Sequence, residues 1–430
     1  MLTDISIINY IFLIISSAFL IKHTFLLLSA RRHVVDYIYM VFFIFYVLPI
    51  FLEEFKGRPT YALFFSKFDI ITSDFITTLI YNILMLFFQF ILYFKFKNRK
   101  VMDIKVSRIN LNLTLTIILY LVIYLPIILT LFFNEREVFL VYGGISLRNV
   151  ENQSFYMDIV NSTNLSVLGI GFLSINNNYS LKKVVKFIPI LFFNLWINGK
   201  RNALVFILLV LTYILINNKT LFIQAKLLII ISLTSIVVLF SQYYMDNIKG
   251  FENPQSEDEK YAMFRIDYGR DHDLKMAIYY EIYNEFPPIL EYRGQSMLFV
   301  ATFYIPRIVW SEKPLTYTAY FTSALLDVPP DFQHFGMTTG IFDEFIVNFS
   351  FFGFFIAIWL ILFLIKKASL INNTFFYLIT LMAVALLLTN DIKSYIPIYI
   401  IWFILYRYIK NLNKRQYIKS RSIFKFNGIT

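Results

Sequence analysis

The stretch FIVNFSFFGFFIAIWLILFLI, Phe345–Ile365, runs for 21 residues without a charged side chain. A helix needs about 20 mostly apolar residues to cross the hydrocarbon core of a bilayer. Similar runs recur along the chain, which is 58% apolar and has a mean hydropathy of +0.64. One soluble core of 430 residues cannot hide that much apolar surface. The sequence therefore predicts an all-α integral membrane protein.

Eleven apolar runs predict about eleven transmembrane helices. The fifth run is weak, because Asn161 and Asn164 lie inside it, and the sixth and seventh are short and joined by a tight turn. The runs lie at 5–28, 34–52, 75–94, 113–133, 158–176, 184–198, 202–217, 221–244, 340–365, 373–389 and 394–409. The predicted regions are transmembrane helices one to eight at 1–244, a large extracytoplasmic loop at 245–339, transmembrane helices nine to eleven at 340–409 and a basic cytoplasmic tail at 410–430.

Charge distribution predicts the orientation of these helices. With the N-terminus outside and the C-terminus inside, the cytoplasmic segments hold 23 of the 39 Lys and Arg residues but only 2 of the 28 Asp and Glu residues. The cytoplasmic side then carries +21 and the rest of the chain −10, as the positive-inside rule requires. Every predicted cytoplasmic loop is basic, including Lys95–Lys100. We interpret these basic segments as orientation signals that contact anionic lipid, not as a nucleic-acid surface.

Metal and cofactor motifs are missing from the sequence. Cysteine is absent, only four histidines are present, and no nucleotide-binding or zinc-binding pattern occurs. The sequence therefore predicts no cofactor and no metal.

The loop at 245–339 is expected to be a lid or platform, since it is too long for a simple tether. Its pattern predicts a helix over Tyr261–Glu285 and an amphipathic or re-entrant helix over Gly294–Val309. A turn-rich piece, Ser311–Gly340, then returns to the membrane.

Basic residues are notable on this acidic outer face. Lys200 and Arg201 lie in a turn between two short helices, where they could clamp a diphosphate or merely extend toward the membrane surface. Arg307, Trp310 and Lys313 form a second group, suited to phosphate and sugar or to anchoring at the interface.

Three further arginines of the loop, Arg265, Arg270 and Arg293, are candidate substrate ligands. The first two stand beside aspartates, in Arg265-Ile-Asp267 and Arg270-Asp-His-Asp273, a pattern that also suits internal salt bridges.

Candidate bases stand near the return to the membrane. Glu344 and Asn348 share a helical face with Gly340, and an ionisable residue in a span usually marks a functional cavity. His334 could equally accept a proton from a sugar hydroxyl. The choice between Glu344 and His334 stays open.

Four segments in order along the chain carry a resemblance to a known family. They are GKRNA at Gly199–Ala203, the segment Arg265–Asp273, YIPRIVWSEKP at Tyr304–Pro314 and GIFDEFIVNFSFFG at Gly340–Gly353. Together they resemble the oligosaccharide repeat unit polymerases, the Wzy-type polymerases of O-antigen and capsular polysaccharide. Ser350 stands where that family usually has a glycine.

The resemblance implies a GT-C-like glycosyltransferase on the outer face of the bacterial plasma (inner) membrane. The donor would be a glycan on undecaprenyl diphosphate and the acceptor one lipid-linked repeat unit, with a flippase and a chain-length regulator as candidate partners. Neither a metal nor a nucleotide sugar would be needed. Arg201 and Arg307, helped by Arg270 and Lys313, would stabilise the diphosphate as it leaves.

Two other functions remain open at this stage. An O-antigen ligase has a similar plan but transfers the finished glycan to another acceptor. A polysaccharide or lipid transporter would show internal repeats and charges deep in several spans, and neither is evident in the sequence.

The predicted topology can be tested with reporter fusions. A reporter fused at Lys313 should be extracytoplasmic and one fused at Lys367 cytoplasmic, because one span separates them. Alkaline phosphatase and fluorescent-protein fusions would measure this, and the same side at both positions would rule out the proposed arrangement.

Overall fold

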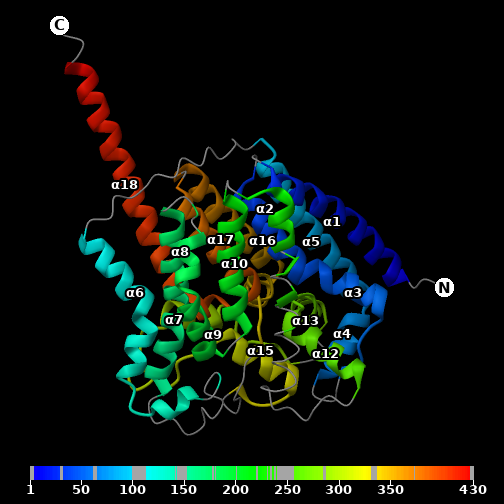
Figure 1. Ribbon diagram of the computed structural model, residues 1–430. Coiled ribbons are helices and arrows are strands. Elements are labelled where there is room, and N and C mark those ends of the chain that lie inside the picture. Colours follow the sequence, from blue (N-terminus) through cyan, green and yellow to red (C-terminus); the bar gives the residue numbers. More distant parts are fainter. Residues whose placement is uncertain are drawn as a thin grey trace. The chain divides into compact units, whose positions relative to one another are not determined.

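The computed structural model describes residues 4–29, 32–61, 65–98, 113–140, 142, 153–176, 179, 181–199, 201–218, 221–229, 231–232, 235–236, 239, 256–283, 287–330, 337–371 and 373–426. Over these ranges the chain is helical and contains no strand (Figure 1). It divides into two compact units. Unit 1 comprises 1–102, 254–372 and 383–430, and unit 2 comprises 103–253 and 373–382.

Unit 1 contains the N-terminal helices, the helices of the large loop and the C-terminal helices. Their bounds are α1 Asp4–Leu28, α2 Val34–Phe42, the π-helix η1 Phe43–Val47, α3 Leu48–Lys56, α4 Lys67–Ser73, α5 Phe75–Phe96, α12 Glu257–Tyr268, α13 Asp271–Ile282, α14 Gln295–Ala301, α15 Tyr317–Leu326, α16 Ile341–Ile371, the 3₁₀ helix η7 Ile392–Tyr395 and α18 Ile396–Phe426. The helix α17, Thr374–Thr389, begins in unit 2 and ends in unit 1.

Five helical segments of the described chain are long and apolar enough to cross a membrane. They are Asp4–Leu28, Val34–Lys56, Phe75–Phe96, Ile159–Asn176 and Ile341–Ile371. Four shorter apolar helices accompany them, at Thr116–Leu131, Ile188–Asn198, Leu204–Asn217 and Thr374–Thr389. This confirms a helical membrane protein. The predicted run 221–244 lies largely outside the described residues, and the number of eleven spans and the sidedness stay predictions.

The second span is not one regular helix. Its middle turn, η1, is a π-helix that leads into Pro49 at the start of α3. Proline has no N–H to donate, and a π-bulge displaces the regular ladder of hydrogen bonds, so carbonyls here need other donors. The Tyr81 hydroxyl of α5 donates to the Tyr46 carbonyl at 2.6 Å, and the Arg270 amide donates to the Phe45 carbonyl at 3.0 Å.

Helix α16 contains a sharp break within the predicted ninth span. Phe349 has φ −134° and ψ 20°, and Ser350 has φ 56° and ψ −162°. Before the break the helix is buried, whereas after it Phe352 and Trp359 are 69% and 62% exposed, as for side chains that face lipid. The part after the break, 351–371, is about 32 Å long and by itself matches the thickness of a bilayer core.

Unit 2 contains α6 Leu113–Leu131, the 3₁₀ helix η3 Arg136–Leu140, α7 Gln153–Asn176, α8 Leu181–Lys186, α9 Ile188–Asn198 and α10 Arg201–Asn217. Polar residues of α7 are satisfied by neighbouring helices: Ser166 donates to the Ile123 carbonyl at 2.6 Å, and the Asn198 amide donates to the Thr163 hydroxyl at 2.8 Å. These bonds satisfy two of the polar side chains inside the fifth apolar run.

Two expected loop helices differ from the structure. The single helix expected over Tyr261–Glu285 is two helices, α12 and α13. They separate at Gly269, where an added Cβ would lie 2.8 Å from the Arg265 carbonyl oxygen. The helix expected over Gly294–Val309 is shorter, because only Gln295–Ala301 is helical and turns follow it.

The break in α16 generates a stability prediction. The backbone of Ser350 lies in a region that essentially only glycine occupies without strain, so Ser350→Gly should stabilise the protein by about 1 kcal/mol. Gly353→Ala should destabilise it strongly, since the new Cβ would clash with the Phe345 carbonyl group of the same helix. Thermal unfolding of the purified variants in detergent would measure both, and a lower midpoint for Ser350→Gly would contradict the assigned backbone.

Candidate functional site

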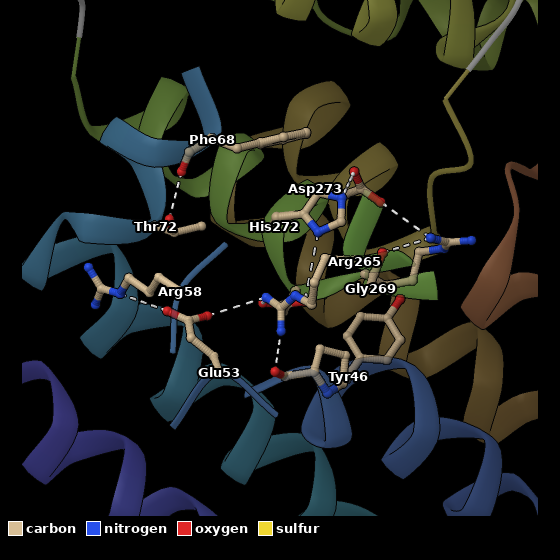
Figure 2. A network of polar contacts seen from close by, with 12 residues as sticks. Tyr46, Glu53, Arg58, Phe68, Thr72, Arg265, Gly269, His272 and Asp273 are labelled. Atoms are coloured by element: carbon tan, nitrogen blue, oxygen red, sulfur yellow. Dashed lines mark hydrogen bonds and ion pairs between the residues drawn. The ribbon is translucent and has the colours of Figure 1, made fainter. Parts of the chain in front are cut away.

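Arg265 is the centre of a buried ionic network in unit 1 (Figure 2). Its guanidinium donates to Asp271 Oδ2 at 2.7 Å, to Glu53 Oε2 at 3.3 Å and to the Pro49 carbonyl. Burial raises the pKa of the Asp271 carboxyl, but the adjacent Arg265 guanidinium, together with His272 and Lys275, more than offsets burial, and the pKa lies below its usual value. Arg265 is 1% exposed, so in this structure it joins the loop to α3.

Arg270 has a similar role at the start of α13. Its Nε donates to the Thr389 carbonyl at 3.1 Å, and its Nη1 donates to the Gly269 carbonyl at 2.7 Å. Thr389 is the last residue of α17, whose final carbonyls have no partner within the helix. The neighbouring carbonyl, that of Leu388, accepts from the Tyr46 hydroxyl at 2.8 Å. Arg270 and Tyr46 therefore cap the end of α17.

His272 and Asp273 lie beside this network as a fully buried pair. His272 Nε2 is 3.2 Å from Asp273 Oδ1, and the His272 ring meets Phe68 edge to face. Burial lowers the pKa of the His272 imidazole and raises the pKa of the Asp273 carboxyl well above its usual value. Both shifts favour the uncharged forms, so the pair adds little net charge beside the arginines.

The carboxylate of Glu344 lies in a second buried cluster, at the start of α16. Its Oε1 accepts from the Ser296 hydroxyl at 3.1 Å, and its Oε2 accepts from the Ile392 amide at 3.1 Å. Asn348 donates to the Ser296 hydroxyl at 2.8 Å and to the Glu344 carbonyl at 2.6 Å. The predicted pair of Glu344 and Asn348 is therefore on one helical face, and Ser296 of α14 joins them.

Two lysines lie over the ring of Phe299, one turn further along α14, and Arg307 lies near one of them, Lys313. The Nζ atoms of Lys313 and Lys393 lie 4.7 and 5.8 Å from the centroid of the Phe299 ring. Burial, and then the nearby charges of Arg307 and Lys393, lower the pKa of the Lys313 ammonium. Arg307 and Lys393 are exposed. Within the described residues, none of the three forms an ion pair with a carboxylate.

Arg293 has a different role from these cations. Its two terminal nitrogens each lie 2.8 Å from an oxygen of Glu281, and Nη1 also donates to the Val347 carbonyl at 3.0 Å. Val347 lies two residues before the break in α16, so Arg293 supplies a donor to a helix end. Its role as a substrate ligand stays a prediction.

The remaining predicted residues lie partly outside the described structure. Gly199 ends α9 with φ 62°, and α10 begins at Arg201, which confirms the tight turn between two short helices. Lys200, His334 and the side chain of Arg201 lie outside the described residues. Their predicted roles, and the half-buried Trp310 as a sugar platform, stay predictions.

Comparisons with models of known protein families, with curated proteins and with solved structures found no match. The resemblance to repeat unit polymerases therefore stays a hypothesis that rests on the four segments.

Sequence reasoning missed Ser296 and Lys393. Ser296 has no distinctive motif around it. Lys393 had a signal, because it is a basic residue on the predicted outer side, between two apolar runs. It lies beyond the large loop, where no site was predicted.

The buried Arg265 and the exposed Arg293 should differ in how much stability is lost when each is replaced by lysine. Arg265→Lys should cost about 3 kcal/mol or more, because a lysine cannot donate to Asp271, Glu53 and the Pro49 carbonyl together and leaves buried charge unpaired. Arg293→Lys should cost below about 1 kcal/mol, because Arg293 is 58% exposed and its ion pair is solvated. Thermal unfolding in the same detergent would measure both. Equal losses would show that Arg265 does not hold the loop.

Proposed function

We propose that this chain is a membrane-embedded glycosyltransferase that joins lipid-linked oligosaccharide repeat units into a surface polysaccharide on the outer face of the plasma membrane. The observation that supports this proposal most is a group of three cations without a described carboxylate partner. Lys313 and Lys393 lie over the ring of Phe299, and Arg307 lies near Lys313. Phe299 is one helical turn along α14 from Ser296, whose hydroxyl bonds to Glu344. The proposal draws its substrate class from the family resemblance.

The cations suit the leaving group of such a reaction. When the bond between the donor sugar and the diphosphate breaks, negative charge develops on the diphosphate, and positioned cations lower the free energy of that state. Arg307 can offer a planar pair of donors, and Lys313 and Lys393 add point charges. Because no described carboxylate neutralises the three, they attract an anion more strongly than Arg265 does, which is paired with Asp271 and Glu53.

Glu344 suits the role of general base. A base must lie within hydrogen-bonding distance of the hydroxyl that loses its proton, at about 2.6–3.2 Å. The Ser296 hydroxyl already occupies such a position at 3.1 Å from Oε1. We infer that an acceptor sugar hydroxyl takes the place of the Ser296 hydroxyl, while the Ile392 amide keeps the carboxylate oriented.

The chemistry then has a simple balance. The acceptor oxygen bonds to the anomeric carbon of the donor, the bond from that carbon to the diphosphate oxygen breaks, and Glu344 takes the hydroxyl proton. The products are a glycan longer by one repeat unit and the free lipid diphosphate.

The proposal predicts a change in glycan length when the gene is deleted and restored. Deletion should leave single repeat units on the lipid carrier, and restoration should return the ladder of longer chains. Gel electrophoresis of surface and carrier-linked glycan would measure this. Long polymer that accumulates on the carrier after deletion would instead indicate a ligase, and unchanged glycan would contradict any role in polymer assembly.

Variants separate the proposed roles. Arg201→Ala, Arg307→Ala and Glu344→Gln should each reduce polymer by a hundredfold or more while protein level and membrane insertion stay normal. Lys260→Gln is a matched control, because this loop lysine pairs only with exposed Glu257 and should leave polymer unchanged. Wild-type polymer from Arg307→Ala would remove the cation cluster from the reaction.

A further inference from the structure

The segment 303–310, which we name the outer wedge, presents large apolar side chains to its surroundings. Ile308 is 99% exposed, Val309 is 77% exposed and Tyr304 is 70% exposed. Isolated apolar side chains on a surface need no explanation, but three within six residues, at the tip of one loop, form a patch typical of an interaction site.

The outer wedge is held in shape by the two cations at its base. The Lys313 ammonium donates to the Phe303 and Ile305 carbonyls, each at 3.0 Å. The Arg307 guanidinium donates to the Pro314 carbonyl at 3.1 Å. The amides of Val309 and Trp310 close turns onto the Pro306 carbonyl at 3.0 and 3.2 Å. Because these bonds satisfy its backbone, the tip is a formed structure whose apolar side chains point outward.

The depth of the outer wedge follows from its contacts with the spans. Lys393 lies in the short connection between α17 and α18, at the point where two apolar helices end. Its Nζ lies over the ring of Phe299, which also contacts Lys313. On the same α14, Ser296 bonds to Glu344 at the start of α16. The base of the wedge is therefore at the level where three predicted spans meet the membrane surface.

We propose that the outer wedge is a membrane-docking surface, whose partner is the outer leaflet of the bilayer. Tyr304, Ile308 and Val309 enter the boundary between headgroups and acyl chains, and Arg307 and Lys393 remain at the depth of the lipid phosphates. An apolar tip bordered by exposed cations is the pattern that binds a membrane interface, since burial of apolar area adds to attraction by anionic lipid. This proposal does not depend on the proposed glycosyltransferase activity.

Lipid fits this surface better than a soluble partner does. The chain is a membrane protein, so the leaflet is present wherever these helix ends are. A protein partner would have to cover Ile308 fully and also supply carboxylates to the cations at the same depth. A leaflet supplies acyl chains at the depth of the apolar tip and phosphates at the depth of the cations.

The experiment uses the absence of cysteine from the chain, which makes a single introduced label unambiguous. Ile308→Cys in the full-length protein is labelled with a nitroxide and reconstituted into vesicles of phosphatidylcholine and phosphatidylglycerol. Glu257→Cys, at an exposed polar position of the same loop, is the matched control. Electron paramagnetic resonance then compares collisions of each label with oxygen, which enters the bilayer, and with a water-soluble nickel chelate.

The expected result is a ratio of oxygen to nickel collisions several-fold higher at position 308 than at position 257. Adding Arg307→Gln and Lys393→Gln to the Ile308→Cys protein should lower that ratio in vesicles that contain phosphatidylglycerol. A label at 308 as open to the nickel chelate as the control would overturn the proposal. So would spin–spin broadening at 308, which indicates a second copy of the chain. If the label at 308 were protected from the nickel chelate only after inorganic pyrophosphate is added, the proposal would also be overturned. That result would indicate a soluble anion as the ligand.

Discussion

The requirement that a buried guanidinium find acceptors within the protein organises the part of the protein that we call unit 1. Arg265 and Arg270 are withdrawn from water, so each must find acceptors within the protein. They find them in backbone carbonyls, that of Pro49 near the start of α3 and that of Thr389 at the end of α17. Glu53 and Asp271 supply the counter-charge for Arg265. The loop is thereby joined to the ends of two apolar segments far away in the sequence, and it serves as a platform fixed to the spans.

This platform determines where the carboxylates of α16 lie. The first part of α16, before the break at Ser350, is buried against α13 and α14, and Arg293 donates to the carbonyl that precedes the break. Glu344 is held by donors from two other elements, Ser296 and the Ile392 amide. A helix that crossed the bilayer without a break would place this carboxylate among lipid-facing residues, where its charge would be costly. The break allows one apolar run to provide both a buried polar cluster and a membrane span.

The cations near the loop fall into two classes that differ in what their charge can do. Arg265 is paired with Asp271 and Glu53, and the buried Arg270 donates to backbone carbonyls, so both have little capacity left for a ligand. Arg307, Lys313 and Lys393 bond to backbone carbonyls or lie over the ring of Phe299, and their charges stay uncompensated within the described chain. Such a cluster is the part of the described chain whose charge is available to an anion. Both the proposed diphosphate site and the outer wedge depend on this difference.

The sequence by itself determined the membrane class, the positions of most apolar helices to within a few residues and the turn at Gly199. Each of these depends on local properties, namely the length of an apolar run or the backbone freedom of one glycine. Glu344 and Asn348 shared a face as predicted, since helical spacing is also local. Tertiary structure decided which arginines are paired, brought Ser296 and Lys393 to the candidate site, divided the loop helix at Gly269 and broke α16 at Ser350. Those outcomes could not be derived from the sequence, because a buried donor or acceptor takes its partner from whichever segment packs against it. For Arg265, those partners are Pro49 and Glu53, more than two hundred residues away in the sequence.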